Sequence, residues 1–95
     1  MAGYYIAEID VHDDAAYAEY RELAAVTIAA HGGEYMVRGG SWESLEGGKP
    51  RSRVVVLRFP SVEVAKGWFN SPEYKKAHAI RARAATSRSF IVEGA

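Results

Sequence analysis

Hydrophobic and polar residues alternate at the start of the chain and predict a β-strand over residues 3–11. The odd positions from residue 5 to residue 11 are all apolar, and so are Tyr4 and Ile6 on the other face. Successive side chains of a strand point to opposite faces, so this strand carries apolar surface on both. We therefore expect helices to cover one face of the sheet and a second copy of the chain to cover the other.

A helix is predicted from Asp14, because apolar residues then recur three and four positions apart. Asp13 is its expected N-cap, since its carboxylate can accept hydrogen bonds from the first free amides, and Asp14 places negative charge where the helix dipole favours it. His31 and the glycine pair after it end the helix, because glycine readily adopts the left-handed conformation of a C-cap. The apolar stripe consists of Tyr17, Tyr20, Leu23, Ala24, Thr27 and Ile28.

The middle of the chain predicts two antiparallel strands. The first covers residues 34–46 and is interrupted by Gly39 and Gly40, because paired glycines within a strand usually mark a bulge or a sharp bend. A turn over residues 46–50 leads into the second strand, over residues 52–59. Its apolar side chains also occupy both faces, with Val55, Leu57 and Phe59 on one and Val54 and Val56 on the other.

Two helices and a final strand follow. Pro60 ends the preceding strand, and Ser61 is the expected N-cap of a second amphipathic helix. Ser71 and Pro72 begin a third helix, as its cap and its first helical residue. A last strand is predicted over residues 87–93.

This order of elements predicts an α+β fold of the ferredoxin-like βαββαβ type, with a four-stranded antiparallel sheet and helices on one face. We expect one domain over residues 1–95. We also expect the first and third strands to be parallel neighbours, which would bring Glu8 and Asp10 beside Arg58 as a charge pair on the helix-free face. The rest of that face is expected to be too apolar for a monomer, with Tyr4, Ile6, Val54, Val56 and Ile91 exposed on it.

Composition narrows the classes of function. Lys and Arg number 12, as do Asp and Glu, and no basic cluster of the kind that binds nucleic acid is present. The absence of cysteine excludes disulfides and thiolate ligands. The first residues do not predict a targeting signal, and no apolar stretch approaches the roughly 20 residues of a membrane helix. We expect a cytoplasmic protein without nucleic-acid or membrane partners.

Several short motifs follow one another along nearly the whole chain: Tyr4-Tyr5-Ile6 with Asp13 and Tyr17, Gly32-Gly33 before Val37-Arg38-Gly39-Gly40, Leu45-Glu46-Gly47, Phe59-Pro60-Ser61, and Ser71-Pro72-Glu73-Tyr74. As an ordered set they resemble the family described as domain of unknown function 1330. The resemblance implies a dimeric α/β barrel, in which two ferredoxin-like sheets face each other with the helices outside. Relatives in that superfamily include cofactor-free monooxygenases, lactone isomerases and haem-handling enzymes, an analogy at the level of fold.

Arg38 and His78 are the candidate catalytic residues. A guanidinium beside Gly39 and Gly40 can hold a carboxylate or an enolate while the glycines allow a ligand to approach closely. Alternatively, Arg38 pairs with a strand neighbour and the glycines only bend the sheet. His78 can act as a general base on a ligand between helix and sheet, or be half-buried packing, since the sequence shows no carboxylate to orient it.

Aromatic side chains of the predicted helices, namely Tyr17, Tyr20, Trp68 and Phe69, form either a ligand pocket or ordinary core. The histidines at positions 12, 31 and 78 lack the spacing of metal ligands, so we expect neither metal nor cofactor. Trp42, after the predicted bulge, is placed to contact a second subunit.

Two functional hypotheses remain. In the first, a site between sheet and helices serves a cofactor-independent enzyme, monooxygenase- or isomerase-like, or a binder of a small anionic or aromatic molecule. Arg38 would anchor the anionic group and His78 would move a proton, while the ligand contacts would be Tyr17, Trp68, Gly39 and Gly40. In the second, the chain is a non-catalytic structural or ligand-binding homodimer module whose residues only brace the fold.

Overall fold

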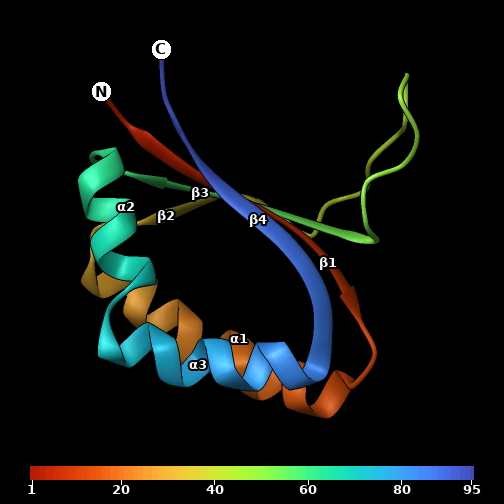
Figure 1. Cartoon of the computed structure of the whole chain (residues 1–95), viewed down its shortest axis with the longest axis horizontal. Coiled ribbons are helices and arrows are strands. Elements are labelled where there is room, and N and C mark those ends of the chain that lie inside the picture. Colours follow the sequence, from red (N-terminus) through yellow and green to blue (C-terminus); the bar gives the residue numbers. More distant parts are fainter.

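A four-stranded antiparallel sheet lies against three helices in the computed structural model, which describes residues 1–95 (Figure 1). The elements are β1 (Gly3–Val11), α1 (Asp14–Ala30), β2 (Glu34–Arg38), β3 (Arg53–Phe59), α2 (Val62–Phe69), α3 (Pro72–Ala84) and β4 (Ala85–Glu93). The strand order is β2-β3-β1-β4, and the helices cover one face of the sheet. This confirms the predicted α+β, ferredoxin-like fold.

The predicted helix starts are confirmed. Asp13, Ser61 and Ser71 are the N-caps of the three helices, and each side chain accepts a hydrogen bond from the backbone amide three residues on. Gly32 follows the end of α1 with φ of 74°, a conformation that glycine adopts without steric cost. The local signals for starting and stopping helices are therefore sufficient in this chain.

The core lies between the sheet and the helices, and Trp68 is at its centre. Trp68 is fully buried, its ring centroid is 4.1 Å from that of Tyr74 and 5.0 Å from that of Tyr5, and its indole nitrogen donates to the Thr27 hydroxyl at 3.0 Å. Alternate residues of β1 from Gly3 to Ile9 are buried on the same side. One side chain thus joins α1, α2, α3 and the sheet.

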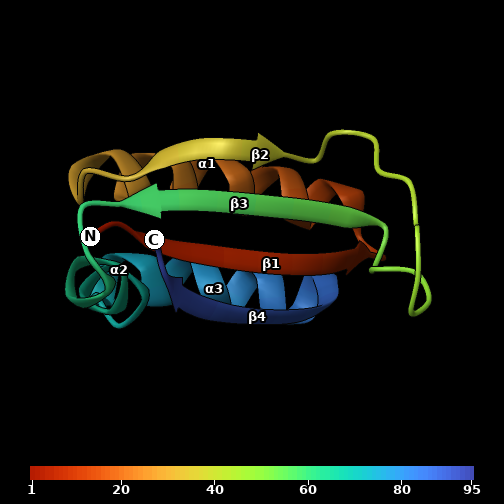
Figure 2. The same ribbon diagram turned by 90° about the horizontal axis from the view of Figure 1, so that it is seen from above.

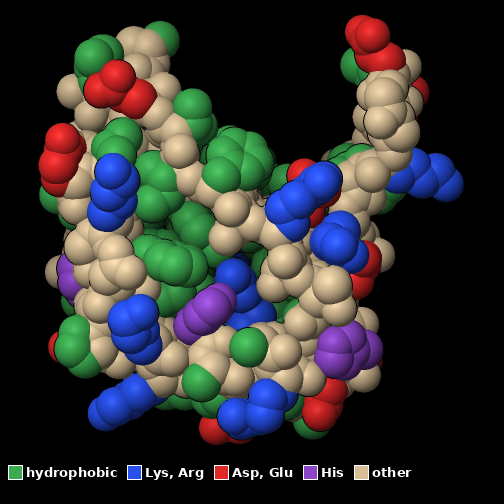
Figure 3. Space-filling view, in the orientation of Figure 1, with side chains coloured by type: hydrophobic (Ala, Val, Ile, Leu, Met, Phe, Trp, Pro, Cys, Tyr) green, Lys and Arg blue, Asp and Glu red, His purple; other side chains and the backbone are tan.

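The second strand is much shorter than predicted. β2 ends at Arg38, its bulge is at Met36 rather than at the glycine pair, and the chain leaves the sheet at Gly39, where φ is 71°. Residues 39–52, here called the arm, extend beyond the ends of β2 and β3 and stand clear of the body on the side away from the helices (Figures 1, 2 and 3). β3 begins only at Arg53, so the sheet offers the arm no strand to pair with.

The expected parallel pairing of β1 and β3 is wrong, and so is the charge pair built on it. The two strands are antiparallel, with Tyr4 opposite Arg58 and Glu8 opposite Val54. The helix crossover keeps β2 parallel to β1, and the hairpin then reverses β3. The ion pairs are Arg58 with Glu34 at 3.1 Å, Arg88 with Glu8 at 2.9 Å and Arg51 with Asp10 at 2.8 Å.

The face of the sheet opposite the helices is apolar, as expected, but its membership differs. Ile91 is opposite Tyr5 and packs on the core, because paired residues of antiparallel strands point to the same side. Phe90 and Val92 take its place, with exposed fractions of 50% and 44%. The apolar side chains of this helix-free face are those of Tyr4, Ile6, Val37, Val54, Val56, Phe90 and Val92, and the charged residues Glu8, Glu34, Arg58 and Arg88 lie around them on the same side. None of the three helices is long and apolar enough to cross a membrane.

Candidate functional site

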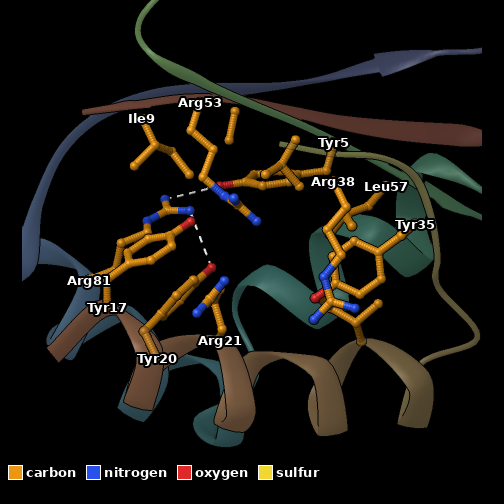
Figure 4. Close-up of a pocket in the computed structure, with 13 residues that line it drawn as sticks. Tyr5, Ile9, Tyr17, Tyr20, Arg21, Tyr35, Arg38, Arg53, Leu57 and Arg81 are labelled. Carbon is orange, nitrogen blue, oxygen red and sulfur yellow. Dashed lines mark hydrogen bonds between the residues drawn. The ribbon is translucent and has the colours of Figure 1, made fainter. Parts of the chain in front are cut away.

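A pocket lies between the inner face of the sheet and α1, with α3 at one end (Figure 4). Its enclosed volume is about 20 Å³, room for one water molecule, and it reaches about 360 Å³ when the open mouth is included. Ala7 contributes only a methyl group to the sheet side, while the aromatic part of the lining comes from Tyr5, Tyr17, Tyr20 and Tyr35.

Four arginines from four different elements line this pocket: Arg21 of α1, Arg38 of β2, Arg53 of β3 and Arg81 of α3. The lining includes no aspartate or glutamate. The three ion pairs of the protein are made by other arginines, so none of these four is paired with a carboxylate. A chain with no net charge therefore concentrates positive charge in one small space.

Arg81 is the most buried of the four, with 2% of its surface exposed. Its two terminal nitrogens donate to the hydroxyls of Tyr20 at 3.3 Å and Tyr5 at 3.0 Å, whereas its Nε has no partner (Figure 4). Burial disfavours the charged form, but the surrounding tyrosines more than offset it and raise the pKa of Arg81. The pocket thus contains a buried cation without a counter-ion, which is costly in a protein interior.

The tyrosines around Arg81 are hydrogen-bond donors at neutral pH rather than bases. Burial raises the pKa of Tyr20 to about 12, despite the opposing effect of Arg81. Burial also raises the pKa of Tyr74, whose hydroxyl lies 2.9 Å from that of Tyr20. The pocket can therefore stabilise negative charge, but its lining holds no carboxylate or imidazole to accept a proton.

The position of the Arg53 guanidinium depends on the first residues of the arm, where the chain leaves β2. Its guanidinium carbon is 5.6 Å from the Tyr17 ring centroid, and its Nε is buried without a partner. A Cβ on Gly39 would overlap this guanidinium, so the missing side chain of Gly39 makes room for Arg53. A Cβ on Gly40 would meet no other atom within 4 Å, so Gly40 plays no such part.

Arg38 and Arg21 lie at the mouth of the pocket. The Arg38 guanidinium covers the Tyr35 ring at 4.1 Å, and that of Arg21 is 5.9 Å from the Tyr17 ring centroid. Both side chains are exposed, and both also line an outer groove of about 350 Å³ between α1 and β2. The pocket therefore opens at this edge of the molecule.

The structure does not bring His78 or Trp68 to the pocket lining. His78 is half-buried on α3, with its ring stacked on Tyr74 at 5.8 Å and 5.4 Å from Phe69. Burial lowers the pKa of His78, and the nearby Arg81 and Lys75 lower it further, so the imidazole is neutral at pH 7. Arg38, Tyr17 and, through Arg53, Gly39 do belong to one site.

Sequence reasoning missed Arg21, Arg53 and Arg81 as members of the site. A signal was present for the last two. Arg53 has the same strand phase as Val55 and Leu57, and Arg81 falls on the stripe of α3 that contains Tyr74 and Ala77. When the other residues on the same face of a strand or helix belong to the core, an arginine on that face is expected to point inward.

A family model described as Domain of unknown function (DUF1330) matches residues 2–95. The chain belongs to this family. This match confirms the resemblance to DUF1330 that the ordered motifs indicate. A comparison with curated proteins finds no match.

Several solved structures share this fold. RPA0582 from Rhodopseudomonas palustris, a protein of unknown function, has a TM-score of 0.75 at 20% identity, over 99% of this chain and 82% of that one. SnoaB from Streptomyces nogalater, a cofactor-independent oxygenase, has a TM-score of 0.71 at 14% identity, over 99% and 93%. A dimeric protein of unknown function with a ferredoxin-like fold from Bacteroides fragilis has 0.64 at 14%, over 98% and 96%. At these identities the likeness shows the fold alone.

Proposed function

We propose that this DUF1330 protein binds a small organic anion with a flat, unsaturated body in the arginine pocket. The observation that carries the proposal is Arg81, a fully buried cation in a pocket without a carboxylate. Moving a charged group out of water costs on the order of several kcal/mol of free energy unless a partner of opposite charge is present. An anionic ligand would supply that partner.

The donors and rings around Arg81 support this class of ligand. The hydroxyls of Tyr5 and Tyr20 converge on the guanidinium, and charge-assisted hydrogen bonds to a carboxylate or enolate are about twice as strong as neutral ones. The Tyr17 and Tyr35 rings provide apolar faces for a flat body whose anionic group would point inward to Arg81, while Arg38 covers the Tyr35 ring at the mouth.

The experiment is calorimetric titration with benzoate and with benzamide, which has the same shape without the charge. We expect the protein to bind benzoate and not benzamide. Arg81→Gln should weaken benzoate by about tenfold to hundredfold, the range for hydrogen bonds to charged groups. Arg83→Gln, at an exposed arginine of the same helix, is the matched control and should leave the affinity unchanged.

Equal binding of benzoate and benzamide would contradict the proposal. So would an Arg81→Gln variant that remains folded by circular dichroism and binds benzoate as tightly as the unaltered protein.

A second candidate function is cofactor-independent oxygenation of an acidic phenol or enol. It is favoured by the fold shared with SnoaB and by four cations that would stabilise a phenolate or enolate. Because no base lines the pocket, the substrate itself must ionise readily there. Oxygen uptake with 4-hydroxycoumarin, an enol that is ionised at neutral pH, and its loss in Arg38→Gln would support catalysis. Binding of this compound without oxygen uptake would favour a binding protein. The role of His78 in moving a proton stays a prediction.

We further propose that the protein works as a homodimer joined through the helix-free face. Phe90, Val92 and Val37 are each more than a third exposed on that face, and exposed apolar patches of this kind mark interaction sites. The dimeric state of the Bacteroides fragilis protein with this fold supports the proposal. The pocket lies on the other side of the sheet, so each subunit would keep its own site.

A further inference from the structure

We infer that the ligand of this pocket carries two anionic groups, one held by an inner pair of arginines, Arg53 and Arg81, and the other by an outer pair, Arg21 and Arg38. The inference rests on the proposed function and specifies the class of ligand as a short dianion. It depends on how the four guanidinium groups are divided between depth and mouth.

The inner pair shares an unusual feature. The Nε atoms of Arg53 and Arg81 are both buried, and they are the two buried side-chain nitrogen or oxygen atoms of the protein that lack a hydrogen-bond partner. Arg81 donates only to phenolic oxygens, and no carboxylate contacts either residue. Most buried polar atoms in native proteins have partners, so two arginines that line one space and each keep an unpartnered donor favour an anion there.

The outer pair lies where the pocket meets the groove. Arg21 and Arg38 are the two residues that line both spaces, and both guanidinium groups are exposed. Glu22 is the one acidic residue of the groove, and it forms no ion pair with either arginine. The outer pair is therefore available to a second anionic group.

Tyr17 connects the two pairs. Its ring centroid lies within 6 Å of the guanidinium carbon of Arg53, an inner residue, and of Arg21, an outer one. These two carbons are thus no more than about 12 Å apart. This upper limit restricts the ligand to a short body of about one aromatic ring with an anionic group at each end, and most of that body would occupy the open mouth, because the enclosed part has room for one water molecule.

A single anionic group would leave most of this charge unbalanced. One carboxylate takes a bidentate pair of donors from one guanidinium, whereas the pocket presents four guanidinium groups from four elements. The guanidinium groups also repel one another in a confined space, and a second anionic group reduces that repulsion. The distribution of arginines therefore matches a dianion better than a monoanion.

The test compares terephthalate with 4-carbamoylbenzoate, which has the same shape but only one charge, by calorimetric titration of the full chain. We expect terephthalate to bind up to about fivefold more tightly, since one added exposed ion pair contributes up to about 1 kcal/mol. The ratio of the two affinities should fall to about one in Arg38→Gln and in Arg21→Gln. Arg83→Gln, outside the pocket, should keep the full ratio.

The outcomes separate this inference from the proposed function. If 4-carbamoylbenzoate binds and terephthalate binds no more tightly, the ligand needs one anionic group and the inference is overturned while the proposed function stands. A ratio that persists in both outer variants also overturns it. If neither compound nor benzoate binds, the proposed function itself fails.

Discussion

Gly39 is the residue at which backbone conformation and pocket chemistry meet. Its φ of 71° lies in the left-handed region, its amide donates to the Val54 carbonyl at 2.9 Å, and the space of its absent side chain is filled by the Arg53 guanidinium. The sequence predicts that Gly39 contacts a ligand directly. In the structure it supports the position of an arginine that faces the pocket.

We predict that Gly39→Ala lowers the free energy of unfolding by about 1–2 kcal/mol, the cost of the left-handed conformation for a residue with a Cβ. It should also weaken benzoate binding, because Arg53 must move away. Urea denaturation and calorimetric titration measure the two effects.

Gly40→Ala is the matched control, since Gly40 has open space around it and does not have positive φ. Its unfolding free energy should change by less than about 0.5 kcal/mol. Equal effects of the two substitutions would show that the Gly39 conformation is unimportant.

At single positions, the sequence predicted part of the site. Arg38 and Tyr17 both line the pocket. Tyr17 lies on the helical stripe that the sequence indicates, whereas Arg38 reaches the inner face because the bulge at Met36 shifts the register of β2. Trp68 was expected at the site, but an aromatic residue on an inward helix face is equally suited to the core, where it lies. Convergence of arginines from four elements depends on tertiary packing, which no local pattern contains.

At the scale of elements, the arm is attached to the body through Asp10 of β1. The Asp10 carboxylate accepts from the Ser52 amide at 2.9 Å, from the Ser52 hydroxyl at 2.8 Å and from the Arg51 guanidinium at 2.8 Å. Glu8 accepts from the Arg51 amide at 3.1 Å. Carboxylates of one strand therefore fix the returning end of a segment that lacks a strand partner.

We predict that acid releases this end of the arm at an unusually low pH. The Ser52 amide and hydroxyl, followed by Arg51, lower the pKa of Asp10 from 3.8 to about 2. A lowered pKa means that the contact is fully present above the ordinary value and is lost as pH falls through about 2. The Ser52 amide proton shift in NMR spectra should titrate with that midpoint, and the step should be absent in Asp10→Asn.

The amide of Ala24, buried in α1, serves as the reference for global unfolding in the same spectra. A Ser52 midpoint at or above 3.8 would show that Asp10 does not hold the arm.

Element by element, local chemistry predicted the helices well and the hairpin poorly. Capping residues and helical periodicity act within a few positions, so the starts of the three helices and the end of the first followed from them. The strand predicted over residues 34–46 failed beyond Arg38, because a strand requires a partner and residues 47–50, with two glycines of positive φ and a proline, supply none. The direction of β3 relative to β1 was also lost, since it follows from topology rather than from local pattern.

At the scale of the whole molecule, we propose that two chains associate through the helix-free face. We predict that Val56→Asp, at the middle of this face, prevents dimer formation and reduces the mass measured by light scattering to that of one 10.4 kDa chain. An unpaired carboxylate buried between two sheets would cost several kcal/mol, roughly.

Val26→Asp is the control, because Val26 is 71% exposed on α1, away from that face. Its mass should equal that of the unaltered protein. If Val56→Asp also keeps the unaltered mass, the two chains do not join through the helix-free face.

β3 carries two surfaces on one backbone, with Arg53 and Val55 toward the pocket and Val54 and Val56 toward the helix-free face. If a ligand shifts β3, occupancy of the pocket and the proposed association of two chains become linked equilibria. If the ligand strengthens association by some factor, association must strengthen ligand binding by the same factor. Apparent affinity would then vary with protein concentration, and titrations at several dilutions would yield the size of this coupling directly.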